Sequence, residues 1–593
     1  MIKFKKFGAL ALAFITCFMF TACGNNNTDV ELDESGNVRP GSTVTTVNFW
    51  GYGDDVEIQV FNKLVKDFNE SNPNIYVKYV QKTSDGYSDN IKTTLGGKKG
   101  PDVFYAGDSD YKTLAEYGYL LPLDNYLSKS SEIVPSDMWS SSINRYKYDV
   151  NTTTSDGPDA KYWGIPKDIG PTVIYYNETY FKAAGITVIS VSEDNLAKFN
   201  NSGKDSRGKT KSDYGIKGEV KAKGYFVLDG KKYFNNQISM SWEECVACSR
   251  VVQSGSAANY GFFTEWWFNY GWSVGGDCIE YIKSDDTQYN GGYWDFTLMD
   301  DTANYIVSDG NSDGFTVNGN KYEAGEIISY QDKLNNVTAS VKTVRSEIIN
   351  ACNEGKLNEL PSQREAFVEF VRLGQKTNTL VDTVGGQNLY GYGITPSPTS
   401  IGGDSGKTLA FANGEIAMLV DGRWNVTNFR DKMDGVYDWD VAPLPQYKEY
   451  DAEGDVTVHG VEAGHSGSVA LCINKKTSVA NAAWKFIEYI GGKTGQTEQS
   501  KSGFAIPTQK EIANTEVFLQ TDRNPKNSIV FVKAAAYETP GDWWYLRDNL
   551  WIDSWAGRLN GDVRNGNLTL SNFEKSSEYT ATFATLKTYT KAK

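Results

Sequence analysis

Hydrophobic and polar residues alternate with two different periods at the start of the folded part of the chain. The apolar runs Val44–Trp50 and Ile75–Val80 predict two β-strands. Between them, four apolar residues recur at the spacing of one helix face: Phe61, Leu64, Val65 and Phe68. This strand–helix–strand order is a βαβ unit, so an α/β fold is predicted here. The loop Gly51–Asp55 then lies at the carboxyl end of the first strand, where open α/β sheets bind ligands.

A segment of mixed pattern, Tyr162–Ile186, organises the middle of the chain. It starts as a short aromatic strand, passes through a stretch punctuated by Gly and Pro, and continues into the apolar strand Thr172–Tyr176. Gly and Pro at such positions are typical of a chain that changes direction or passes between domains. A helix is expected next, with Asn177 as its N-cap and Gly185 just beyond its end.

Residues 1–22 have the pattern of a lipoprotein signal peptide. Three lysines precede the apolar run Phe7–Met19, which is too short to cross a membrane as a stable helix. The following Phe20-Thr-Ala-Cys23 resembles a bacterial lipobox, in which Cys23 is lipidated and becomes the first residue. A buried cysteine in a simple secretory signal is the alternative. Residues 23–43 are rich in Asn, Asp, Gly and Ser and lack apolar periodicity, which predicts a flexible tether.

Length and composition limit the domain organisation and the partners. A chain of 593 residues is longer than one core usually serves, so two or more domains are expected. The formal net charge of −15 argues against a nucleic-acid partner. The chain also has 15 Trp and 36 Tyr. Such a density of rings in a polar chain indicates that some of them act on accessible surface, although most are expected to fill the core.

The cysteines and one acidic turn are predicted to carry no metal chemistry. Cys245 and Cys248 have C-x-x-C spacing but fall in a helical pattern, without a second pair or a nearby His, and zinc needs about four ligands. Free, mostly buried thiols are therefore predicted. Asp309–Gly314 copies the start of a calcium loop, but Asn320 replaces its closing Glu, so a solvated turn is predicted. No cofactor and no metal are expected.

Two stretches have the pattern of inserted hairpins. Tyr225–Tyr233 and Phe315–Tyr322 each contain a Val, an Asp-Gly or Asn-Gly turn and a closing Lys-Tyr, which is a hairpin signature. The preceding Asn200–Gly224 is rich in Lys, Ser and Gly and has little capacity to form a core. These hairpins are expected to be accessory elements.

Several motifs occur together in an order that resembles one family. They are Gly100-Pro-Asp-Val103, the segment Tyr162–Ile186, Glu265-Trp-Trp267, Leu409–Trp424, Ser502–Pro507 and Asp542–Arg547. In this order they resemble the bacterial extracellular solute-binding proteins of family 1, the large carbohydrate-binding family that includes maltose-binding protein. Each motif is weak alone, but the ordered set is specific for the family and not for the ligand.

The resemblance implies a two-lobed periplasmic-binding-protein fold of the α/β class, type II-like, with three interlobe crossings. Lobe 1 would contain residues 44–170 and 463–512, and lobe 2 residues 171–462 and 513–593, with inserts near 187–240 and 280–340. The protein would be a monomer without enzymatic activity, lipid-anchored on the extracellular face of the cell membrane of a Gram-positive type of bacterium. It would capture a carbohydrate, most simply an oligosaccharide, and deliver it to the permease subunits of an ABC importer.

A sugar ring has an apolar face that an aromatic plate can cover and a rim of hydroxyls that polar side chains can bind. The residues matched as plates are Trp50, Trp267, Trp424 and Trp544. The polar residues expected to contact the ligand are Tyr52, Asp54, Asp108, Lys167, Asp168, Glu265, Arg423 and His465.

Other functions stay open at this stage. A binding protein for a cationic or peptide-like solute is the main alternative, because the acidic composition suits cations. A secreted glycoside hydrolase is more remote, because it needs two carboxylates about 5–10 Å apart, which the sequence does not place. Adjacent tyrosines can bind ferric ion, but Tyr175-Tyr176 matches a structural strand of the family.

Overall fold

The computed structural model describes residues 43–53, 55–97, 100–107, 110–151, 155, 157–284, 286–289, 291–337, 341–374, 376–401, 403–536, 546 and 550–589. The signal segment and the tether with Cys23 lie outside the described residues, as do three predicted site residues, Asp54, Asp108 and Trp544. Within the described ranges, no helix combines the length and the apolarity that crossing a membrane requires.

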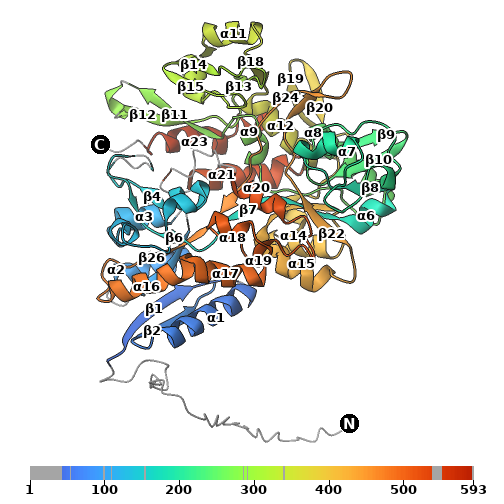
Figure 1. The fold of residues 1–593 in the computed structure, drawn as a ribbon. Coiled ribbons are helices and arrows are strands. Elements are labelled where there is room, and N and C mark those ends of the chain that lie inside the picture. Colours follow the sequence, from blue (N-terminus) through green and yellow to red (C-terminus); the bar gives the residue numbers. More distant parts are fainter. Residues whose placement is uncertain are drawn as a thin grey trace, which may run out of the picture.

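A five-stranded mixed sheet forms the first lobe, at the bottom of Figure 1. Across the sheet its strands are β2 (Ile75–Gln81), β1 (Thr45–Gly51), β3 (Val103–Gly107), β26 (Val469–Ile473) and β6 (Ile165–Pro166). β1 is parallel to β2 and β3, whereas β26 is antiparallel to β3 and β6. Helix α1 (Asp55–Ser71) joins β1 to β2, which confirms the predicted βαβ unit, and its predicted apolar face is buried. Helices that complete this lobe include α2 (Tyr87–Gly96), α3 (Tyr111–Glu116), α16 (Ala480–Gly491) and α17 (Lys493–Ser502).

The second lobe is built on a smaller, fully buried sheet. Its central strand β7 (Gly170–Asn177) is antiparallel to β21 (Met418–Gly422) and β22 (Trp439–Ala442) on its two sides. Helices α14 (Gly403–Ala412) and α20 (Ile529–Ala536) pack against it. The predicted strand over 172–176 lies within β7. Asn177 caps the following helix α6 (Glu178–Ala183) by accepting a hydrogen bond from the Tyr180 N–H (3.1 Å), and Gly185 has a φ of +74°, both as predicted.

Three segments carry the chain between the two sheets, and hydrogen bonds tie them together. The first crossing lies between β6 and β7, the second between β25 (Ser466–Gly467) and β26, and the third follows α17. The Lys167 N–H donates to the Val469 carbonyl (3.0 Å), and β25 pairs with the start of β7. The Ile169 N–H donates to the Ile506 carbonyl of the third crossing (3.1 Å). All three crossings are therefore neighbours.

The inserted segments form several small sheets on the second lobe, at the right and at the top of Figure 1. They are β8 (Ile186–Ile189) with β10 (Lys231–Asn235) and β9 (Tyr225–Leu228), β11 (Ile279–Ser284) with β12 (Gly291–Phe296), β13 (Asn304–Val307) with β18 (Leu357–Leu360), and β14 (Phe315–Val317) with β15 (Asn320–Tyr322). Both predicted hairpins are confirmed as β9–β10 and β14–β15. In each turn both residues have positive φ, Asp229 with Gly230 and Asn318 with Gly319, which suits the right-handed strand twist.

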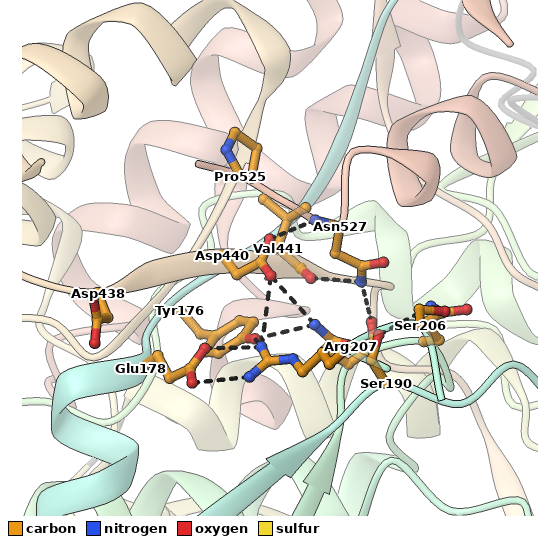
Figure 2. A network of polar contacts seen from close by, with 12 residues as sticks. Tyr176, Glu178, Ser190, Ser206, Arg207, Asp438, Asp440, Val441, Pro525 and Asn527 are labelled. Carbon is orange, nitrogen blue, oxygen red and sulfur yellow. Dashed lines mark hydrogen bonds and ion pairs between the residues drawn. The ribbon is translucent and has the colours of Figure 1, made fainter. Parts of the chain in front are cut away.

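A polar network anchors the first insert to the buried sheet (Figure 2). Arg207 donates to both carboxylate oxygens of Glu178 (2.9 and 2.8 Å) and to the Tyr176 hydroxyl (3.1 Å). Asp440 of β22 lies 3.7 Å from the Arg207 guanidinium and accepts from the Asn527 N–H (2.9 Å). The network thus joins the insert, β7, β22 and the chain leading into α20.

The remaining helices surround this core. They include α8 (Trp242–Gly255), α9 (Phe268–Ser273), α12 (Gln363–Gly374), α15 (Val426–Met433), α21 (Leu550–Arg558) and α23 (Ser577–Leu586). The described cysteines are free, and all but the half-buried Cys352 are buried, as predicted. Asp309–Gly314 forms a largely exposed turn. In the described part of the chain, no group of three or more His, Cys, Asp or Glu side chains has a geometry that could hold a metal ion.

Candidate functional site

A cleft of about 880 Å³ opens where the two sheets meet at the crossings. The first lobe contributes Tyr52, Glu57, Lys167 and Asp168, and the second contributes Trp266, Lys407, Leu409, Trp424, Asn425 and Asn428. Gly170, Gly467 and Phe504, one from each crossing, complete the wall. Residues of both lobes therefore border the same cleft.

Trp424 lies flat on two glycines. β21 ends at Gly422, and the 3₁₀ turn Arg423–Asn425 brings the indole back over the strand end. A Cβ on Gly422 would lie 2.0 Å from the Trp424 ring, and one on Gly170 would lie 2.8 Å from it. The ring is half-buried and lines the cleft. Glycine at both positions thus lets the backbone support one face of the indole, as a stacking platform requires.

Trp266, and not the predicted Trp267, lines the cleft. Trp267 packs edge-on against Trp555, with ring centroids 5.0 Å apart, and against Phe268. The two tryptophans are adjacent at the start of α9, so one ring can face the core while the other faces the cleft. The motif located the pair, but only the packing of Trp555 decides which ring belongs to the site.

Lys407, which the sequence reasoning missed, joins Glu265 on the wall of the second lobe. Its ammonium pairs with the Glu265 carboxylate and lies 3.9 Å from Asp421, which also accepts from the Asn425 amide (2.8 Å). The Lys407 nitrogen is 5.4 Å from the centre of the Trp266 ring. A lysine in an apolar helical pattern could have drawn attention, but its partners are far away in the sequence.

Lys167 and Asp168, both predicted, face each other across the first-lobe wall together with Glu57. The Lys167 ammonium lies 2.5 Å from Asp168 and 3.0 Å from Glu57. Burial alone would lower the pKa of Lys167, but the two carboxylates outweigh burial and raise this pKa above its ordinary value. The lysine is therefore charged, and it holds two carboxylates at the cleft. Tyr52 lies beside them and packs on Tyr87 and Tyr105 (4.7 and 5.6 Å between ring centroids).

Arg423 is not a rim residue in this structure. It is among the residues that border the cleft, but it is fully buried, and its guanidinium donates to the Gly503 carbonyl (3.1 Å) and the Ser528 hydroxyl (3.0 Å). Burial lowers the pKa of Arg423 to about 9, and the nearby Arg430 contributes. The side chain fastens the third crossing to β21, because carbonyl oxygens there face its donors.

Two further predicted residues lie apart from the cleft surface. Trp50 is half-buried on β1, where the Lys82 ammonium lies 3.8 Å above its ring, and it is not among the described residues that line the cleft. The period of two along β1 directs Phe49 into the core and Trp50 to the other face of the sheet. His465 stacks on Trp266, with centroids 4.3 Å apart and planes at 10°.

The fold and the cleft define a two-lobed binding protein of α/β class. Two family models, both described as bacterial extracellular solute-binding protein, match residues 54–273 and residues 365–526. Together these matches cover more than half of the chain. The chain belongs to the bacterial extracellular solute-binding proteins, as its motifs indicated.

Individual relatives are distant in sequence. The multiple sugar-binding protein of Streptococcus mutans is 23% identical over 187 residues, which span 31% of this chain and 38% of that relative's length. The GacH receptor of Streptomyces glaucescens, solved unliganded and with acarbose, superposes with a TM-score of 0.55 at 16% identity, covering 92% of this chain and 100% of the receptor. An ABC substrate-binding protein of Listeria monocytogenes, in complex with cycloalternan, has a TM-score of 0.54 at 16% identity, covering 92% and 98%. At these identities the structures establish the shared two-lobed fold.

Proposed function

We propose that this protein captures an oligosaccharide in the interlobe cleft and delivers it to an ABC importer. The observation that carries the proposal is the pair of tryptophans, Trp266 and Trp424, on one wall of a cleft whose opposite wall holds paired carboxylates. The sugar-binding relative and the sugar-bound structural neighbours support the same class of ligand.

The chemistry of the two walls suits a carbohydrate. An indole buries the C–H face of a sugar ring at about 25 cal/mol per Å² of apolar area. Glu57, Asp168 and Glu265 can accept hydrogen bonds from sugar hydroxyls, while Lys167 and Lys407 orient these carboxylates. The cleft volume of about 880 Å³ is near the upper end of the roughly 300–1,000 Å³ of ligand pockets, which favours several sugar units over one.

The paired lysines argue against a cationic solute. A ligand ammonium would have to compete with a lysine for each of these carboxylates. Lys167 already contacts Asp168 at 2.5 Å and Glu57 at 3.0 Å. Lys407 already contacts Glu265. A neutral hydroxyl can share a carboxylate oxygen with a lysine, because each oxygen has two lone pairs.

A thermal-shift screen tests the proposal. The panel contains maltotetraose, cellotetraose, acarbose and cycloalternan, with spermidine and a tetrapeptide as the competing classes. A ligand at 100 times its Kd adds about 2.7 kcal/mol to the stability of the folded state. We expect a rise in melting temperature with at least one oligosaccharide. A rise with spermidine or the peptide alone would contradict the proposal.

Delivery to an importer needs a test in cells. We expect that deletion of the gene abolishes uptake of the oligosaccharide that binds in the screen, and that the intact gene restores it. Normal uptake in the deletion strain would contradict the transport role while leaving the binding role intact.

A further inference from the structure

His465 is held in the second crossing by its backbone. It precedes β25, and its carbonyl accepts hydrogen bonds from the Thr172 N–H (2.9 Å) and the Thr172 hydroxyl (3.3 Å) at the start of β7. The residue is thus fixed to the strands that join the lobes, although its side chain belongs to the environment of the cleft.

The imidazole of His465 supports the cleft tryptophan Trp266. The two rings are nearly parallel, at 10°, with centroids 4.3 Å apart. Phe268 packs against the same imidazole at 5.9 Å and is itself buried. Trp266 also packs on Phe268, with ring centroids 5.7 Å apart, so the three rings form one cluster in which His465 covers a face of the cleft tryptophan.

The environment keeps this imidazole neutral. Burial, together with the positive charges of Arg145 and Lys407, lowers the pKa of His465 to about 3. A neutral ring can stack in a half-buried position without the cost of a desolvated charge.

Each of the two cleft tryptophans is seated on a different crossing. Trp424 lies over Gly170, at the first crossing, and Trp266 lies on His465, at the second. A ligand that stacked on both rings would therefore rest on side chains that are supported by the first and the second crossing.

We propose that His465 is a positioning residue, which holds Trp266 from the second crossing in the orientation that stacks on the ligand. This inference rests on the proposed oligosaccharide-binding function. His465 does not itself line the cleft in the described part of the chain, so it acts through Trp266.

Calorimetric titration with maltotetraose, cellotetraose and acarbose tests the proposal. Immobilising a freed side chain on binding costs about 0.5–1.5 kcal/mol, so His465→Ala is expected to weaken binding about 2- to 12-fold. His465→Phe keeps a planar ring and is expected to bind within about twofold of the unchanged protein. If His465→Ala does not fold, His465→Leu fills the space without a planar ring and replaces it.

Two controls isolate the effect. The only other histidine of the chain, His459, lies on β24 (Val456–His459) and pairs with Asp309 at 2.9 Å, away from the cleft. His459→Ala should leave the affinity unchanged. In the double variant with Trp266→Ala, loss of His465 should cost no further affinity, because its effect passes through that ring. Additive losses would overturn the proposal.

A readout without ligand separates this inference from the proposed function. In protein labelled with 5-fluorotryptophan, the ¹⁹F resonance of Trp266 is assigned as the one that is missing from the spectrum of the Trp266→Phe variant. We expect it to shift or broaden in His465→Ala and to stay in place in His459→Ala. An unmoved resonance would overturn the positioning role. If the resonance moves but no sugar binds, the proposed function alone fails.

Discussion

Single residues decide whether an aromatic ring faces the cleft or the core. Trp424 reaches the cleft because Gly422 and Gly170 leave room for its ring to lie on the backbone. Trp267 is half-buried and packs against Trp555 and Phe268 instead of lining the cleft. The same residue type thus lines the cleft at one position and packs against other rings at another.

Truncation of Trp424 should separate binding from stability. Trp424→Ala is expected to lose about 1–3 kcal/mol of oligosaccharide affinity, the value of burying one large side chain, with a small change in the melting temperature of the free protein. Trp267→Ala is the matched control, since its ring packs against the buried Phe268 and Trp555, and its loss should lower the melting temperature and spare the affinity. Calorimetric titration and differential scanning calorimetry measure both quantities. A large loss of stability in Trp424→Ala with intact binding would assign this ring to the core.

One added methyl group at Gly422 should displace the platform. In Gly422→Ala the new Cβ would lie 2.0 Å from the Trp424 ring, so the ring must move and oligosaccharide affinity should fall by up to about 3 kcal/mol. The control Gly557→Ala adds a Cβ where no heavy atom lies within 4 Å and should bind normally. Unchanged affinity in Gly422→Ala would mean that the ring position does not matter for binding.

At the scale of elements, charged residues join segments that are far apart in the sequence. Arg423 fastens the third crossing to β21, and Arg207 fastens the first insert to β7 and β22 (Figure 2). The first insert is therefore fastened to the buried sheet of the second lobe by charged contacts. Removing one partner of such a pair leaves a buried charge without compensation, which costs more than the pair contributes.

Asp440 should make stability depend on pH. Burial raises the pKa of Asp440 to about 6, although hydrogen bonds from Asn527 and the charge of Arg207 oppose this. Because the folded-state pKa lies above the unfolded value of about 3.9, the contribution of Asp440 is most favourable below pH ~4 and is lost as the pH rises through 6. Between pH 4.5 and 7.5 the unchanged protein should lose about 2 kcal/mol of unfolding free energy relative to Asp440→Asn.

Urea unfolding at the two pH values measures this difference. Asp438→Asn, which removes an exposed carboxylate two residues away, is the control and should leave the pH dependence unchanged. Equal pH dependence of Asp440→Asn and the unchanged protein would contradict a raised pKa at this carboxyl.

At the scale of the whole molecule, the proposed delivery to an importer calls for a protein that stays at the membrane surface. The lipobox-like Phe20–Cys23 follows the first 19 residues of the chain, and the stretch 23–43 leads from it to the first strand. Attached lipid with two or more acyl chains gives stable membrane anchoring, whereas one chain is marginal. Cys23→Ala should therefore move the protein from the membrane fraction to the medium. Cell fractionation with immunoblotting measures the distribution, and Cys352→Ala, a half-buried thiol elsewhere, should stay at the membrane. Retention of Cys23→Ala at the membrane would contradict lipidation at Cys23.

The sequence by itself determined the elements whose cause is local. Apolar spacing defined α1, the Asn177 side chain capped α6, and Asp-Gly and Asn-Gly turns defined two hairpins, because each needs only neighbouring residues. The ordered motifs also determined the family, since they mark the crossings and one cleft tryptophan, Trp424.

Tertiary structure alone placed Glu57, Trp266 and Lys407 in the cleft, next to residues such as Lys167 and Trp424 that the motifs predicted. Lys407 contacts Glu265, which is 142 positions away in the sequence, and His465 contacts Trp266, which is 199 positions away. Arg423 turns inward because carbonyl oxygens of the third crossing lie beside it, and Trp267 because Trp555 does. These outcomes depend on contacts between distant segments, which no local pattern encodes, because a side chain's direction is set by what packs against it once the chain has folded.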